Sequence, residues 1–441
     1  MRQVEDVGDA AGGRSTVPYQ MSIAAELGEI AANAGLRRVQ MMAWRDLDDP
    51  EAGGSEVYAS TIAELWAQAG IDVTMLTSAV RGHPQQVGRA GYRVIRRFGR
   101  YSVFPRMAVA GALGHWSRPD GLIEIWNGMP FFSPLWARCP RVVFLHHVHA
   151  EMWDMALAQA SLARLGKFLE FQAAPPLYRG SRIVTLSPSS RREIVDRLGL
   201  PASNISVVPP GVDSRFSPGG QADQKADHPL VVAVGRLVPV KRFDVLIDVL
   251  VEVRRRHPTL RAVIAGEGYE RRALEARVDA ARASDWLSLP GRLSDDEIVR
   301  LYRRAWVAAA TSLREGWGMT LTEAAACGTP AVATAITGHI DAVTEGVSGL
   351  LVNEDHDMAS GMVRALDAML SDQGLRRRLG VGALARAEGL SWAATAKGTL
   401  IALANEASRT QRSVSTPAAL GPPAPGVPLS AAAPATGQPR E

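Results

Sequence analysis

Short runs of apolar residues recur along the chain, and stretches with helical spacing of apolar residues separate most of them. In the first half the runs lie at 39–43, 72–76, 122–126, 142–145 and 183–186, and in the second half at 231–234, 261–265, 307–310 and 331–334. Segments such as 55–69 and 190–198 between them predict helices. Short apolar strands that alternate with helices form parallel sheets covered on both faces, so the pattern predicts an α/β protein.

A polar segment that begins Ser-Pro-Gly-Gly, 217–228, divides the strands into two sets and predicts a linker. The expected units are an N-terminal extension at 1–36, with a helix at 21–34, and two Rossmann-like, doubly wound domains at 37–217 and 228–389. Residues 408–441 are rich in Pro and Ala, bury little surface and predict a disordered tail. Open α/β sheets bind ligands at the carboxyl ends of their strands, so a cleft between the two sheets is the expected site.

Composition indicates a cytoplasmic protein with an ample core. Of 441 residues 46% are apolar, yet no stretch approaches the roughly 18 uncharged apolar residues that span a bilayer. The acidic, Gly-rich start has no apolar core typical of a secretion signal. Cys139 and Cys327 are far apart in unrelated contexts, which indicates neither a disulfide framework nor a Cys-x-x-Cys metal site.

The formal net charge of +4 is mild, although arginines gather at 92–100 and at Arg191-Arg192. They are interpreted as a solvated face, with attraction to anionic lipid at the inner face of the plasma membrane as the alternative. Nucleic acid is not an expected partner, because no base-stacking aromatic set or recognition-helix pattern accompanies them.

The segment Glu315-Gly-Trp-Gly-Met-Thr-Leu-Thr-Glu323, followed by Ala-Ala-Ala-Cys-Gly-Thr-Pro330, carries the most chemical information. A strand leads into a turn bounded by glycines, and a helix is predicted to start near Thr320. The unpaired amides at a helix N-terminus favour a diphosphate, and glycines permit close backbone approach. Two carboxylates separated in this way are better placed to bind hydroxyl groups than to share a proton in acid–base catalysis.

This Glu-x7-Glu spacing, with Gly316 and Gly318 inside it and Ala-Cys-Gly-Thr-Pro after it, resembles the donor-site signature of the family-4 retaining glycosyltransferases. The resemblance covers about 38–400 and implies the GT-B fold, in which two Rossmann-like domains face a central cleft. It implies transfer of a hexose from a UDP-, GDP- or ADP-sugar to a lipid, saccharide or small-molecule acceptor, with retention and without a metal or other cofactor. It also implies that a helix at about 390–407 braces the first domain.

The resemblance extends to individual residues. Glu315 would bind sugar hydroxyls and Glu323 the ribose, while Gly318, Met319 and Thr320 would face the diphosphate. In the run Gly235-Arg-Leu-Val-Pro-Val-Lys241, Arg236 and Lys241 would grip the diphosphate beside Gly235. Leu293, in Gly291-Arg-Leu-Ser, would contact the nucleobase through its backbone. Gly53 and Gly54 match the family's glycine loop and would face the donor phosphate and acceptor across the cleft.

Three histidines follow a predicted strand in Leu145-His-His-Val-His149. His146 matches the family's sugar-facing histidine, and His147 stands where the family often has an acidic residue. Since successive side chains of an extended chain point to opposite sides, His146 is predicted to face the cleft and His147 to face away. Core or helix-capping histidines, and a His-x-His zinc site with no evident partner ligands, are the alternatives.

Other motifs are less informative. Asp46-Leu-Asp48 is formally the metal motif of the other main glycosyltransferase fold, but its polar context predicts a solvated loop and no bound metal. Gly266-Glu-Gly268 lacks the third glycine of a dinucleotide fingerprint. The functional alternatives are a nucleotide-sugar epimerase of the same fold and a catalytically silent, membrane-associated binding protein.

Overall fold

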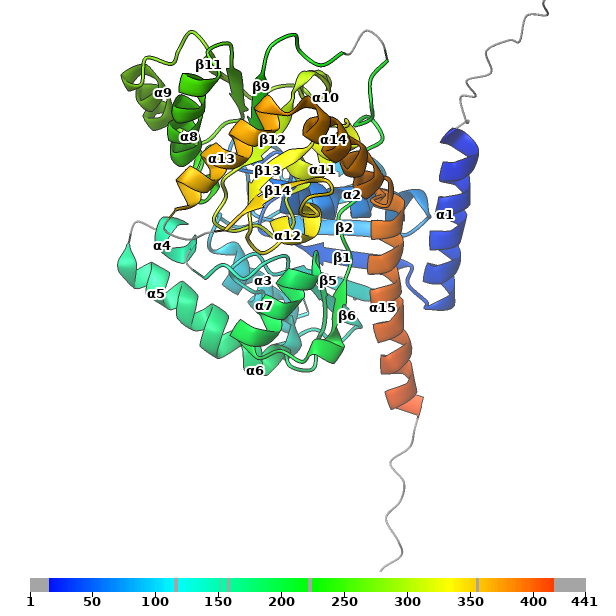
Figure 1. Ribbon diagram of the computed structural model, residues 1–441. Coiled ribbons are helices and arrows are strands. Elements are labelled where there is room, and N and C mark those ends of the chain that lie inside the picture. The colour runs from blue at the N-terminus through cyan, green and yellow to red at the C-terminus, as the bar shows by residue number, and fades with distance from the viewer. Residues whose placement is uncertain are drawn as a thin grey trace, which may run out of the picture.

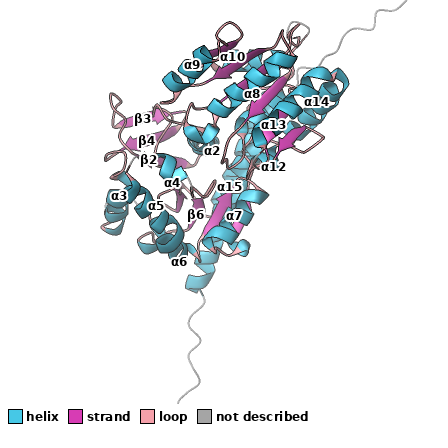
Figure 2. Ribbon diagram, turned by 60° about the vertical axis from the view of Figure 1, so that its left-hand side comes forward, coloured by secondary structure: helices cyan, strands magenta, loops and turns pink. Residues whose placement is uncertain are grey.

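The computed structural model describes residues 16–114, 118–150, 152–156, 159–220, 224–353 and 357–415. Two α/β units, each built around its own sheet, lie one above the other (Figure 1), and the turned view of Figure 2 shows the same two units. The prediction of two sheets of mainly parallel strands is therefore confirmed. None of the helices in the described ranges is long and apolar enough to cross a lipid bilayer.

The first sheet has the strand order β3-β4-β2-β1-β5-β6-β7-β8, and every neighbouring pair is parallel except β3 with β4. Its strands are β1 (Arg38–Met42), β2 (Asp72–Thr77), β3 (Gln86–Arg89), β4 (Tyr92–Arg96), β5 (Gly121–Ile125), β6 (Arg141–Phe144), β7 (Arg182–Thr185) and β8 (Ile205–Val207). The helices of this part are α2 (Gly54–Gln68), α3 (Val103–Ala112), α4 (Met152–Ala156), α5 (Ala160–Phe168), α6 (Ala174–Tyr178) and α7 (Pro188–Leu198).

The second sheet is entirely parallel, in the order β11-β10-β9-β12-β13-β14. Its strands are β9 (Leu230–Val234), β10 (Arg261–Ala265), β11 (Leu287–Gly291), β12 (Val307–Ala310), β13 (Ala331–Thr334) and β14 (Gly349–Val352). Its helices are α8 (Phe243–Arg256), α9 (Arg271–Ala280), α10 (Asp295–Arg304), α11 (Met319–Ala326), α12 (His339–Ala342), α13 (Met358–Ser371) and α14 (Gln373–Glu388). Because β9 and β12 are neighbours, the loops that follow them open at the same edge of the sheet.

The long helix α15 (Trp392–Ser415) returns from the second unit to the first, where it runs beside α1 (Thr16–Asn33) (Figure 1). The Trp66 indole N–H on α2 donates to the carbonyl oxygen of Ala396 at 3.0 Å, and Leu400 and Leu403 are buried against the first core. The helix extends past the predicted boundary at 408, and Arg409 pairs with Glu406 at 2.8 Å. Residues 416–441 of the predicted tail lie outside the described residues.

Candidate active site

The loops after β9 and β12 bring a lysine and a carboxylate together. The Lys241 ammonium donates to Oε1 of Glu315, and the Ser312 hydroxyl donates to the same oxygen at 3.1 Å. Burial alone would raise the pKa of Glu315, but the nearby Lys241 charge and these hydrogen bonds hold the pKa at about 2. Both side chains are partly exposed, so the ion pair is open to a ligand from the cleft side.

The start of α11 lies immediately beyond this pair. Gly318 precedes the helix with φ of +107°, a left-handed conformation that side chains of other residues rarely adopt. The first amides of a helix, here those of Met319 and Thr320, have no partner within it and carry partial positive charge. Gly235 lies on the other side of the pair, where an added Cβ would stand 3.5 Å from Cε of Lys241.

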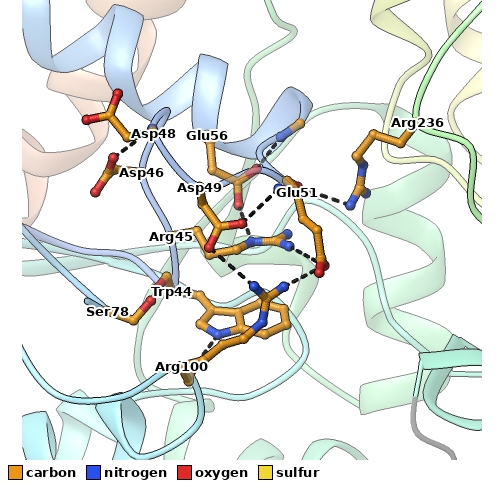
Figure 3. Close-up of polar contacts among 11 residues, drawn as sticks. Trp44, Arg45, Asp46, Asp48, Asp49, Glu51, Glu56, Ser78, Arg100 and Arg236 are labelled. Atoms are coloured by element: carbon orange, nitrogen blue, oxygen red, sulfur yellow. Dashed lines mark hydrogen bonds and ion pairs between the residues drawn. The ribbon is translucent and has the colours of Figure 1, made fainter. Parts of the chain in front are cut away.

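The glycine loop before α2 faces these groups from the first domain. A side chain at Gly53 would lie 3.1 Å from Nε of Arg236, and one at Gly54 would lie 3.2 Å from the sulfur of Met319. The Arg236 guanidinium donates to the carbonyl oxygen of Glu51 at 3.3 Å (Figure 3). The cations of one domain and the glycine loop of the other thus meet across a narrow gap.

The His146 ring packs into the first domain. It lies edge-on to Tyr58 with ring centroids 4.8 Å apart, near Phe144, and only 5% of the residue is exposed. Burial lowers the pKa of His146 to about 3. Its backbone carbonyl contacts the second domain, because a Cβ on Gly316 would lie 2.6 Å from that oxygen.

The His147 ring lies on the other side of the chain, stacked on His149 with centroids 4.7 Å apart. Burial lowers the pKa of His147 to about 4; the Glu315 charge opposes this shift, whereas Arg236 and Lys241 add to it. These charges do not act on His146 in the same way, so His147 is the imidazole nearer to the cations of the cleft. Within the described residues its Nε2 has no hydrogen-bond partner.

Glu323 lies one turn inside α11, away from the Lys241 pair. Burial, together with the negative charges of Asp295 and Asp213, raises the pKa of Glu323 to about 7. Asp295 begins α10, directly after the loop that contains Leu293. The Leu293 loop and Glu323 therefore lie toward the same side of the site, and the two carboxylates of the Glu-x7-Glu segment have separate environments.

Comparison with known proteins identifies the family. Residues 52–216 match the family described as Glycosyltransferase Family 4, and residues 220–385 match the family described as Glycosyl transferases group 1. The chain is 30% identical to the D-inositol 3-phosphate glycosyltransferase of Nocardia farcinica over 79% of this chain and 84% of that protein. This chain is a family-4 glycosyltransferase.

Solved structures confirm the GT-B fold. Sucrose-phosphate synthase from Thermosynechococcus elongatus aligns with a TM-score of 0.70 and 21% identity, over 86% of this chain and all of that one. Anabaena HepE, solved in complex with UDP and glucose, aligns with a TM-score of 0.64 and 17% identity, over 86% of this chain and 100% of that chain. The cleft described above is the one between the two domains of that fold.

In this glycosyltransferase the glycine loop rests on an ion-pair cluster that the sequence did not reveal (Figure 3). The buried Arg45 binds Glu56 at 3.2 Å and Glu51 at 3.4 Å, and Arg100 binds Glu51 at 2.5 Å. Glu56 also accepts from the Gly53 N–H at 2.8 Å and so supplies the Glu half of a capping box at the start of α2, whereas Gly53 has no side chain to supply the other half. The Gly53-x-x-Glu56 spacing was the available signal, because a capping residue followed three positions later by Glu marks a helix start.

The prediction that Asp46 and Asp48 lie in a solvated loop is wrong for Asp46, whereas the Asp48 side chain is partly exposed. Asp46 is 0% exposed and binds the Arg96 guanidinium through both oxygens at 2.7 and 2.9 Å. Asp48 binds Arg96 and, at 2.6 Å, Arg89. Arg96 is likewise buried within β4, so this part of the arginine-rich stretch is not a solvated face. In the ranges that the structure describes, no cluster of three or more His, Cys, Asp or Glu side chains could hold a metal ion.

Further contacts join the domains beside the site. The backbone N–H of Ser189 donates to Asp341 at 2.9 Å, and the Ser189 hydroxyl accepts from the Gly338 N–H at 2.8 Å. The Ser190 hydroxyl donates to the carbonyl oxygen of Gly316 at 3.2 Å. The N-terminus of α7 thereby holds the Gly316 segment against the first domain, a role that no motif in the sequence indicated.

Proposed function

We propose that this enzyme transfers a hexose from a nucleotide diphosphate sugar to an acceptor hydroxyl with retention of configuration and without a metal. One observation carries the proposal: Arg236, Lys241 and the N-terminus of α11 converge opposite the glycine loop. Fixed positive charge there would stabilise the negative charge that develops on a leaving diphosphate. Glu315 would bind sugar hydroxyls, Glu323 the ribose, and the Leu293 backbone the base.

The sugar contact of the first domain is proposed for His147 rather than His146, because the His146 ring packs against Tyr58 and the His147 ring lies nearer Glu315 and Lys241. A neutral imidazole, favoured by the low pKa of His147, can accept a hydrogen bond from a sugar hydroxyl. Glu315 is tied to Lys241 and is thereby less available as a nucleophile. We therefore propose front-face displacement. The bond from the anomeric carbon to the diphosphate breaks, the acceptor oxygen bonds on the same face, and the acceptor proton passes to a departing phosphate oxygen.

The related proteins suggest which substrates to test first. Anabaena HepE was solved with UDP-glucose, and the Nocardia relative is named for D-inositol 3-phosphate. Uridine diphosphate sugars are therefore the first donors to test. A phosphorylated cyclitol is the first acceptor to test, followed by saccharides and lipids. The reaction is proposed to take place in the cytoplasm, and for a lipid acceptor at the inner face of the membrane.

The proposal is tested by following UDP release over a panel of donors and acceptors. Release that requires both a donor and an acceptor, with a glycosylated product detected by mass spectrometry, is the expected result. Release of UDP or conversion of the donor sugar without any acceptor would favour the epimerase alternative. Nucleotide binding without turnover on any acceptor class would favour a silent binding protein.

Transfer is expected to continue in excess EDTA, because Arg236, Lys241 and the α11 N-terminus would supply the positive charge that a metal supplies elsewhere. The measurement compares initial rates before and after chelation, with an Mg²⁺-dependent transferase as a positive control for chelation. Loss of activity with EDTA and its return on adding Mg²⁺, Mn²⁺ or Zn²⁺ would contradict metal independence.

UDP affinity is expected to fall as the pH drops through about 7, because the raised pKa of Glu323 leaves its carboxyl about half protonated there. An ionised carboxylate accepts hydrogen bonds from ribose hydroxyls more strongly than a neutral carboxyl does. If only the ionised form binds well, affinity changes by about tenfold between pH 8 and pH 6. Calorimetry measures the UDP affinity of the wild type and of Glu323→Gln at each pH. UDP itself takes up protons equally in both experiments, so any difference in pH dependence comes from Glu323. An identical pH dependence in the variant would remove Glu323 from the ribose site.

A further inference from the structure

The loop that contains His147 and His149 is held from behind by one buried carboxylate, that of Glu170. Its Oε1 accepts from the backbone N–H of His149 at 2.7 Å. Its Oε2 accepts from the N–H of Ala150 at 3.2 Å and from the indole N–H of Trp153 at 2.8 Å. Glu170 is 0% exposed, and burial raises the pKa of its carboxyl, while the hydrogen bonds from these three donors oppose that shift and satisfy both oxygens.

An irregular turn of helix presents this carboxylate. Residues Leu169–Ala173 form a π-helical turn between α5 and α6. Pro175 and Pro176 follow after Ala174, and a proline lacks the N–H and crowds the carbonyl four residues earlier. A regular α-turn is therefore disfavoured at this point. Such wide turns insert one extra residue and are frequent at functional sites.

The loop cannot easily hold its conformation without this support. Ala150 has φ of +45°, which is strained for a residue with a Cβ. The His149 ring is bounded by Trp153 at a centroid distance of 5.8 Å and by Gly128, where an added Cβ would stand 2.9 Å from the ring. The His147 ring stacks on His149 in turn. A shift of the His149 backbone therefore moves both rings.

We infer that Glu170 is a positioning residue for the transfer reaction: through the amides of His149 and Ala150 it fixes where the His147 and His149 imidazoles stand at the cleft. This rests on the sugar-binding role proposed for His147. The role goes beyond stability because the charge of Arg236 acts on both His147 and His149, whereas the hydrogen bonds that Glu170 accepts come from the loop itself, at His149, Ala150 and Trp153.

The test is Glu170→Gln, whose amide NH2 replaces one of the two acceptor oxygens and faces an N–H donor. Its control is Glu406→Gln. Glu406 is a buried carboxylate on α15 that accepts from the Arg409 guanidinium at 2.8 and 2.9 Å. It lies beside Arg182 at the start of β7, the end of the strand opposite the cleft, so the change is made away from the histidine loop. Both variants weaken the hydrogen bonds of a buried carboxylate, so both melting temperatures should fall.

Glu170→Gln is expected to lower kcat by about tenfold with little change in donor KM, since misplacement of a reacting group costs rate rather than nucleotide affinity. Glu406→Gln should keep kcat close to wild type. The imidazole ¹H–¹⁵N signals of His147 and His149 should shift in Glu170→Gln and stay in place in Glu406→Gln. If Glu170→Gln does not fold, Gly128→Ala displaces the same rings from the opposite side and should give the same kinetic and NMR changes.

Unchanged histidine signals, or equal loss of kcat in the two glutamate variants, would overturn the inference. The NMR readout needs no substrate. If no donor and acceptor pair is turned over, the proposed function fails on its own test, while the signals still decide whether Glu170 positions the rings.

Discussion

Replacing Lys241 with Ala is expected to lower kcat by about 10²–10³-fold while the fold remains intact. Lys241 is the cation closest to Glu315, and loss of one fixed charge at a leaving group costs roughly 2–4 kcal/mol in the transition state. The same change should let the pKa of Glu315 rise from about 2, because the ammonium that holds it low is gone. Steady-state kinetics at saturating donor measure the effect, and circular dichroism checks the fold.

Lys397→Ala is the matched control, because Lys397 also forms an ion pair, with Glu26, but on the exposed surface of α15 and α1. Such surface pairs contribute little, so this variant should behave as wild type. If Lys241→Ala turned over donor at the rate of Lys397→Ala, the diphosphate would have to bind elsewhere.

Replacing His147 with Ala is expected to reduce kcat by about 30-fold, corresponding to roughly 2 kcal/mol for one lost hydrogen bond to the sugar, with UDP affinity unchanged. His146→Ala should instead lower the melting temperature, since its ring packs against Tyr58 and Phe144 and its removal leaves a cavity. The two variants are compared by kcat at saturating donor, UDP calorimetry and thermal melting.

His257→Ala serves as a control for a histidine outside the cleft, where its ring binds Asp367 at 2.8 Å. It should change neither kcat nor UDP affinity. A larger loss of kcat in His146→Ala than in His147→Ala would return the sugar contact to the residue that the family resemblance indicates. Wild-type kinetics in both variants would make the cluster structural.

The sequence predicted the two sheets because their central strands are short, apolar and separated by helical spacing. It missed strands that break this pattern. β4 carries two arginines, and the partner of its buried Arg96 is Asp46, fifty residues away, so only the folded chain shows that the charge is neutralised. β11 contains Pro290 at one edge of the second sheet, and β14, at the other edge, begins with a glycine.

The second-domain part of the site followed from local motifs, because Arg236, Lys241 and Glu315 lie in loops directly after β9 and β12. The first-domain part depends on long-range contacts. Successive side chains of an extended chain point to opposite sides, and the rings of His146 and His147 do so here. Which ring lies nearer to the cations depends on where α2 and its Tyr58 pack, which the local sequence does not show. Glu170 could not be assigned from sequence, because its role requires a π-turn that brings it beneath a loop twenty residues earlier.

Acceptor-dependent transfer is tested most directly by ¹H NMR of the first product formed from an α-linked UDP-sugar in the presence of EDTA. We expect a new α-glycoside that appears together with UDP and only when an acceptor is added. A β-linked first product would contradict front-face retention, and donor consumption at the same rate without acceptor would contradict glycosyl transfer itself.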